Sequence, residues 1–176
     1  MSLAVAIASF LILFLNPAVT GADMGFKIWS ADFKEGQRVP KAHTCEGGDT
    51  SPVLAWQDPP KGTKSYVLVV EDPDAPSGTF VHWIVFDIPG SSTGLERGAG
   101  KGATPPAMHG RTSFGRAGYG GPCPPPGHGT HRYFFRLKAL DIDALGLEQG
   151  AGRQDIDRAI KGHVLKEAET MGTYSR

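Results

Sequence analysis

The segment SYVLVVEDPDAPSGTFVHWIVFDI, residues 65–88, contains two apolar runs separated by a short polar stretch. The first run, residues 65–70, is rich in β-branched and apolar side chains, which is typical of a strand. The second run, residues 80–88, is apolar on both faces and predicts a central strand that is covered from both sides. Proline, aspartate and glycine in residues 73–78 predict a turn between the two runs. The segment therefore predicts two neighbouring strands of one sheet.

Further strands are predicted at residues 26–29, at residues 53–56 and at residues 131–139, where apolar and mostly charged side chains alternate. Residues 89–130 are rich in glycine, proline and serine and predict a long irregular loop, which in a compact domain is usually functional. Apolar residues near the end of the chain fall on one helical stripe and predict a C-terminal helix: Ile156, Ile160, Val164, Ala168 and Met171. The order of elements indicates a mainly β protein with little helix.

Length and charge restrict the class of protein. A chain of 176 residues is the usual size of one domain, and 40% apolar residues are enough for a packed core. Its 18 basic residues are balanced by 18 acidic ones, which argues against nucleic-acid binding and against a polybasic membrane surface.

The amino-terminal segment predicts export. Residues 3–15 (LAVAIASFLILFL) are an apolar run of 13 residues, too short to cross a hydrocarbon core of about 30 Å. Small residues at 18–22 follow it, as at a signal-peptide cleavage site. We therefore predict a signal peptide at 1–22, a mature domain at 23–176 without a membrane span, and a periplasmic or secreted location. The alternative is an uncleaved anchor.

Cys45 and Cys123 are the two cysteines of the chain. In an oxidising compartment they can form one disulfide, and the alternative is two thiols that never meet. Neither lies in a CxxC motif, so we expect no structural zinc, and the sequence predicts no metal or cofactor.

Three polar residues share a face with apolar neighbours at a predicted strand end. Counting by two along each strand places Asp72 with Tyr66, Leu68 and Val70, His82 with Ile84 and Phe86, and His131 with Tyr133 and Phe135. An antiparallel arrangement of the strands brings the carboxylate and both imidazoles to one rim. The alternative for each histidine is a hydrogen-bonded core residue. His128 lies three residues before His131, but such residues face opposite sides of an extended chain, so the pair is a weak indication of metal binding.

This rim suits a small anion. Protonated imidazoles and backbone N–H groups donate to phosphate oxygens, and glycine allows the backbone to approach closely. Gly120, Gly121 and the Cys123 amide are the backbone candidates, in a loop that prolines hold before a ligand binds.

The motifs around these residues resemble the phosphatidylethanolamine-binding protein family, in particular its bacterial Raf-kinase-inhibitor-like branch. DPDAP at 72–76 with His82-Trp83 is similar to the family's first ligand-site motif, and GYGGPCPP at 118–125 with GHGTHRY at 127–133 is similar to the second. The resemblance implies a large antiparallel sheet packed on a second, smaller sheet, with few peripheral helices. It also implies a pocket formed by these residues: Asp72, His82, Tyr119, Gly121, Cys123 and His131.

The leading functional hypothesis is a non-enzymatic protein that binds a phosphate-like anion or a phospholipid headgroup and modulates signalling. One alternative is an inhibitor of a protein partner, such as a kinase or protease, that acts through the loop at 91–126. A further alternative is a hydrolase that uses Asp72, His82 and His131. The sequence does not decide between a monomer and a homodimer.

Overall fold

Strand β3 (Ser65–Asp72) lies in the middle of a five-stranded antiparallel sheet and is buried along its whole length. The computed structural model describes residues 25–102 and 107–176. The sheet runs in the order β6-β4-β3-β7-β8. Its other strands are β4 (Phe80–Pro89), β6 (Met108–His109), β7 (His131–Leu140) and β8 (Val164–Tyr174). The antiparallel β3–β4 pair expected from the opening segment is confirmed.

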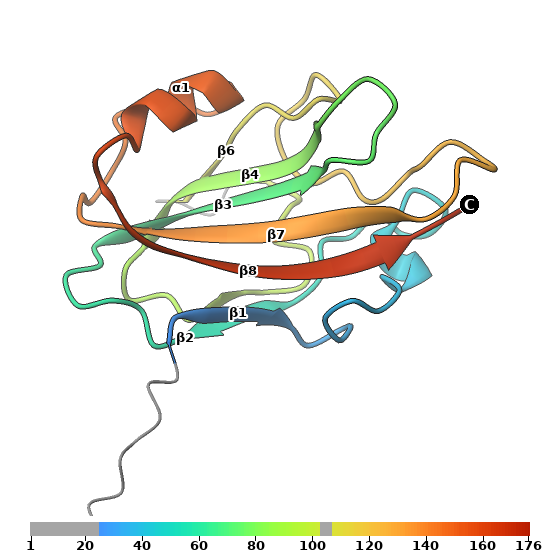
Figure 1. Cartoon of the computed structure of the whole chain (residues 1–176). Coiled ribbons are helices and arrows are strands. Elements are labelled where there is room, and N and C mark those ends of the chain that lie inside the picture. The colour runs from blue at the N-terminus through green and yellow to red at the C-terminus, as the bar shows by residue number, and fades with distance from the viewer. Residues whose placement is uncertain (1–24, 103–106) are drawn as a thin grey trace, which may run out of the picture.

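A second, three-stranded sheet packs against one face of the large one (Figure 1). Its strands are β1 (Lys27–Ser30), β2 (Leu54–Gln57) and β5 (Gly94–Leu95). Aromatic side chains from both sheets fill the space between them, and Trp56 of β2 lies 5.4 Å from Tyr66 of β3, measured between ring centroids. The mainly β architecture, with a large sheet packed on a smaller one, is therefore confirmed.

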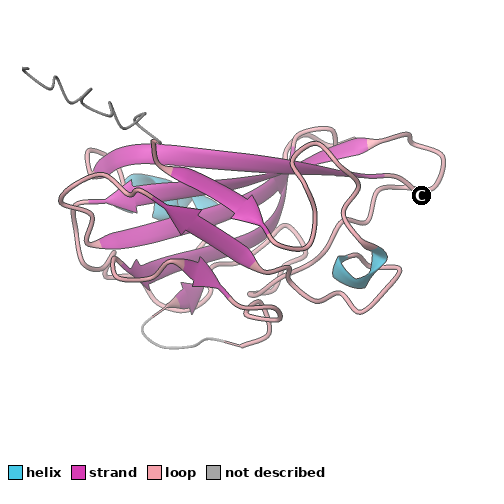
Figure 2. Ribbon diagram, turned by 90° about the horizontal axis from the view of Figure 1, so that it is seen from below, coloured by secondary structure: helices cyan, strands magenta, loops and turns pink. Residues whose placement is uncertain are grey.

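The helix α1 (Arg153–Ala159) packs on the opposite face of the large sheet, where Ile156 and Ile160 join Val67, Ile84 and Phe86 in a second core cluster. Apolar residues of β4 lie in both clusters, so the prediction that this strand is covered from both sides is confirmed. A short 3-10 helix, η1 (Lys41–His43), lies at the far end of the molecule from α1 (Figures 1 and 2).

A helix near the C-terminus is confirmed, but its predicted extent is wrong. Val164, Ala168 and Met171 lie on β8, which pairs with β7 along nearly its whole length. Val164 and Ala168 are four residues apart, a spacing that fits one face of a helix and, being even, also one face of a strand, whereas Met171 is three residues after Ala168 and lies on the other face of β8. Gly162, with φ of 85°, provides the turn that ends the helical segment before β8 begins.

Strand β4 contains two β-bulges. Val70 pairs with Trp83 and Glu71 with Val81, so His82 is an extra residue in the ladder. Near the other end of β4, Asp87 has φ of 57° at the second irregularity. The placement of His82 on the face of Ile84 and Phe86 is therefore wrong, because the bulge reverses the alternation at this point.

The two cysteines form a disulfide across 78 residues of sequence. The bond joins the segment after η1 to the loop that precedes β7 (Cys45–Cys123, Cα to Cα 5.4 Å). Of the two possibilities that the sequence allowed, the disulfide is the one found.

The predicted signal peptide at 1–22 lies outside the described residues. Within 25–102 and 107–176, no helix has the length and apolar character needed to cross a membrane.

A charged network joins α1 to the large sheet. The Glu71 side chain is 6% exposed and accepts hydrogen bonds from Arg136 of β7 and, at 2.6 Å, from Arg153 of α1. A carboxylate taken out of water is stabilised only when such partners are present.

We expect loss of the disulfide to lower the free energy of unfolding by about 2–4 kcal/mol, because an intact bond closes a long loop in the unfolded chain. The measurement is urea unfolding of the wild type with and without dithiothreitol, with the double variant Cys45→Ser/Cys123→Ser as control. Dithiothreitol should not affect the double variant, and equal stability of oxidised and reduced wild type would contradict the prediction.

Replacing Glu71 by alanine should destabilise the fold by about 2–3 kcal/mol, because it leaves two partly buried guanidinium groups without their shared acceptor. Asp143→Asn is the matched control, since it removes a pair with Lys64 in which the aspartate side chain is 85% exposed. Chemical denaturation of both variants should separate them clearly. Equal midpoints would show that the network contributes no stability.

Candidate functional site

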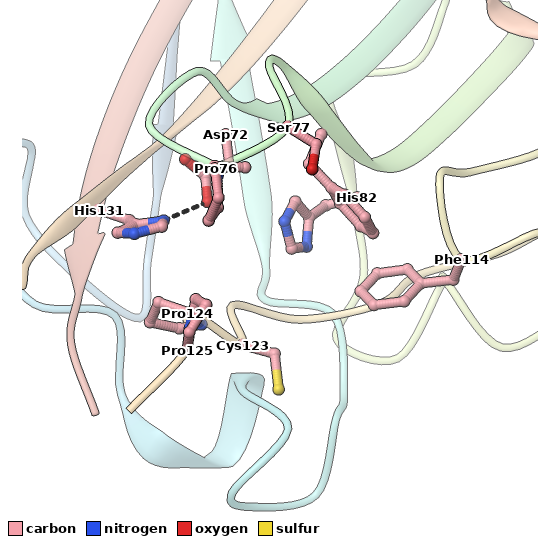
Figure 3. Close-up of a pocket in the computed structure, with 11 residues that line it drawn as sticks. Asp72, Pro76, Ser77, His82, Phe114, Cys123, Pro124, Pro125 and His131 are labelled. Atoms are coloured by element: carbon pink, nitrogen blue, oxygen red, sulfur yellow. Dashed lines mark hydrogen bonds and ion pairs between the residues drawn. The ribbon is translucent and has the colours of Figure 1, made fainter. Parts of the chain in front are cut away.

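A cavity of about 260 Å³ lies at the edge of the large sheet, where β3 ends and where β4 and β7 begin. In Figure 3, Asp72 and His131 lie on one side of it and Phe114 on the other, with His82 between them. The cavity is lined by eleven residues: Asp72, Ala75, Pro76, Ser77, Phe80, His82, Phe114, Cys123, Pro124, Pro125 and His131.

The Asp72 carboxylate is buried and both of its oxygens accept hydrogen bonds. His131 Nδ1 donates to Oδ2 at 2.7 Å, and the backbone amide of Asp74 donates to Oδ1 at 2.8 Å. The exposed fractions of the Asp72 and His131 side chains are 4% and 2%. This contact fixes the imidazole ring and places a proton on Nδ1.

His128 contacts the other nitrogen of His131. The distance from His128 Nδ1 to His131 Nε2 is 2.8 Å. The expectation that these two histidines face opposite sides is wrong, because Gly129, with φ of 93°, turns the chain between them before β7 begins.

His82 is held by the glycine loop. Its Nδ1 donates to the carbonyl oxygen of Gly120 at 2.7 Å, so Nε2 is the nitrogen available to a ligand. Burial lowers the pKa of His82 below its usual value, despite the carbonyl and the nearby Asp72. The ring meets the edges of Tyr133 and Phe114 at centroid distances of 5.2 and 5.4 Å.

Two of the predicted residues lie outside the cavity lining. The Gly121 amide donates to Asp49 Oδ1 at 2.6 Å, and a side chain at this position would collide with the His43 carbonyl. The Tyr119 hydroxyl donates to that same carbonyl at 2.7 Å. The structure thus brings Asp72, His82, Cys123 and His131 together, and it places Tyr119 and Gly121 behind them as supports.

The Gly120 amide is also engaged within the protein. It donates to the backbone carbonyl of His82 at 3.0 Å. Of the three backbone candidates, Cys123 is therefore the one in the lining.

Alternation places Tyr133 on the face of His131 but does not indicate that its hydroxyl lies next to Asp72 and His82. Tyr133 is fully buried, and its hydroxyl has no hydrogen-bond partner among the described residues. Burial raises its pKa, and the neighbouring Asp72 adds to the shift. From the sequence, Tyr133 is one more residue on the apolar face of β7, and its hydroxyl is the only signal that distinguishes it.

The opposite wall of the cavity is apolar. Phe80 and Phe114 meet edge to face at 4.8 Å between centroids, and Phe114 remains 41% exposed at the mouth. Pro76, Pro124 and Pro125 also line the cavity, and Figure 3 shows them on the side of Asp72 and His131. The cavity therefore has a polar end near Asp72 and an apolar end near Phe114.

The titratable groups are not arranged as a metal site. In residues 25–102 and 107–176, no group of three or more histidine, cysteine, aspartate or glutamate side chains could hold a metal ion.

Comparison with known proteins shows what this chain is similar to. The family model of phosphatidylethanolamine-binding protein matches residues 29–175. A UPF0098 protein of Aquifex aeolicus is 48% identical over 151 residues, which cover 85% of this chain and 88% of that protein.

Two solved bacterial structures share the fold. Escherichia coli YbcL, described as a new member of the mammalian family, has a TM-score of 0.81 and 34% identity, covering 86% of this chain and 98% of its own. A homolog from Chlamydia trachomatis has a TM-score of 0.78 and 37% identity with the same coverage of both chains. The protein therefore belongs to the phosphatidylethanolamine-binding protein family.

Proposed function

We propose that this protein binds a small phosphate-type anion in the cavity beside Asp72, either free or as the headgroup of a phospholipid. The observation that carries the proposal is the presence of two imidazoles, His82 and His131, in one cavity whose carboxylate is already hydrogen-bonded on both oxygens. The proposed role is binding rather than catalysis. The phosphate group is the part of the ligand that the site recognises.

The charge of the site supports an anion once its histidines carry protons. With a proton on both ring nitrogens, His131 balances the charge of Asp72, and a protonated His82 adds a net positive charge. The buried hydroxyl of Tyr133 lies behind the cavity lining, next to Asp72 and His82.

The two ends of the cavity match a phosphate ester. Its anionic oxygens suit the imidazoles, and the group esterified to it suits the wall formed by Phe80 and Phe114. The name of the family supports this choice of ligand.

The hydrolase interpretation lacks an activated nucleophile. Ser77 lines the cavity, but among the described residues no hydrogen bond joins its hydroxyl to an imidazole. A screen of esters and phosphoesters for turnover tests it. The partner-inhibitor interpretation, with its contact surface on 91–126, stays a prediction that pull-down with loop variants can test.

Replacing His131 by alanine should weaken binding of inorganic phosphate and of phosphoethanolamine at least about tenfold, because a charge-assisted hydrogen bond is lost. Isothermal titration calorimetry measures the effect. His163→Ala is the matched control, since His163 is a half-exposed residue that pairs with Asp141. Equal affinity of the wild type and His131→Ala would remove the proposal.

Sulfate should bind more tightly at pH 5.5 than at pH 7.5. The pKa of His82 is lowered by burial, so the ring is neutral at pH 7.5 and becomes a donor at Nε2 only as the pH falls below the usual value. Sulfate is the chosen probe because it does not titrate in this range.

The lowered pKa of His82 also affects the stability of the fold when no ligand is bound. Because the unfolded chain takes up the His82 proton more readily, acidification through about pH 6.5 and below should lower stability, and added sulfate should restore it. Thermal unfolding at both pH values checks this, with His82→Phe as the variant that should show a smaller pH dependence. For the binding prediction of the preceding paragraph, an affinity for sulfate that is equal at both pH values, or higher at pH 7.5, would be the contradicting result.

A further inference from the structure

We infer that His128 caps the anion site: it is hydrogen-bonded to His131 Nε2 and is displaced from it when an anion binds. This inference rests on the proposed function and concerns how the same site is controlled.

Both ring nitrogens of His131 are engaged within the protein. Nδ1 is 2.7 Å from Asp72 Oδ2 and Nε2 is 2.8 Å from His128 Nδ1. An imidazole has two nitrogens, so His131 has no further position for a ligand. A phosphate oxygen can reach it only by replacing one of these two partners.

His128 is the partner that can leave. The contact with Asp72 is buried on both sides, whereas His128 is an exposed residue. Gly127 and Gly129 flank it with φ of 74° and 93°, so neither of its neighbours in sequence has a side chain that restricts its ring. Its backbone amide donates to the Pro125 carbonyl at 3.1 Å, so the loop backbone is held independently of the contact between the two rings.

The exchange conserves protons when His131 carries one on each nitrogen. Nε2–H then donates to His128 Nδ1 before the exchange and to an anionic oxygen after it. One hydrogen bond breaks and one forms, and the bond between Nδ1–H and Asp72 is unchanged.

The cap selects for charge as well as reducing affinity. A neutral hydroxyl or amide replaces the imidazole acceptor with one of similar strength and gains little, whereas an anionic oxygen forms a stronger, charge-assisted bond. We therefore assign to His128 a preference of the cavity for phosphate-type ligands over neutral polar ones.

Calorimetric titration of inorganic phosphate into the wild type and His128→Ala tests the cap. A net hydrogen bond of ordinary strength predicts that His128→Ala binds phosphate about threefold to tenfold more tightly. The same substitution in a His131→Ala background should give no gain, because the contact that it removes is already absent.

His163→Ala serves as the control for loss of a half-exposed histidine, and thermal unfolding without phosphate confirms that each variant is folded. Tighter binding by His128→Ala that disappears in the His131→Ala background supports the cap. Equal binding overturns the cap and leaves the proposed function standing, and weaker binding does the same by making His128 a ligand of the anion. Absence of phosphate binding in every variant, including the wild type, overturns the proposed function together with the cap.

Discussion

The extra residue in β4 at His82 is the constraint on which the site depends. Regular pairing with β3 would put His82 on the face that α1 covers, together with Ile84 and Phe86. The bulge directs the imidazole to the other face, where Asp72 and His131 lie. The Gly120 carbonyl then fixes the ring through Nδ1. A local irregularity of one strand thus decides whether the cavity has one imidazole or two.

The surrounding structure is organised to hold the cavity before a ligand arrives. Asp49 holds the Gly121 amide, Tyr119 holds the His43 carbonyl, and the Cys45–Cys123 bond ties the proline-containing wall to the segment after η1. Each contact joins parts of the chain that are far apart in sequence. Because their order is established on folding, a ligand does not have to supply the free energy for ordering the wall.

Much of the fold follows from patterns of period two in the sequence, and the errors have physical causes. The strand at 131–140 is evident because apolar side chains dominate one of its faces, and the strand at 65–72 because it is rich in β-branched and apolar residues. The helical stripe failed beyond Ile160 because a spacing of four does not distinguish helix from strand. Asp72 and His131 could be placed by alternation, whereas His82 reached the predicted rim through a bulge that alternation does not reveal.

The roles of Gly121 and His128 depend on contacts that local pattern does not encode. The partner of Gly121 is a carboxylate 72 residues away, and the turn at Gly129 that returns His128 to His131 is set by backbone conformation.

The bulge at His82 means that regular strand pairing and ligand recognition favour different backbone conformations at this point of β4. Regular pairing at His82 in place of the bulge would remove this interruption of the ladder between the two central strands, a change that favours a more regular sheet. The imidazole would then face the helix instead of the opening. Sequence optimisation that rewards ideal backbone geometry would therefore tend to produce a more stable protein that lacks the second imidazole in its cavity.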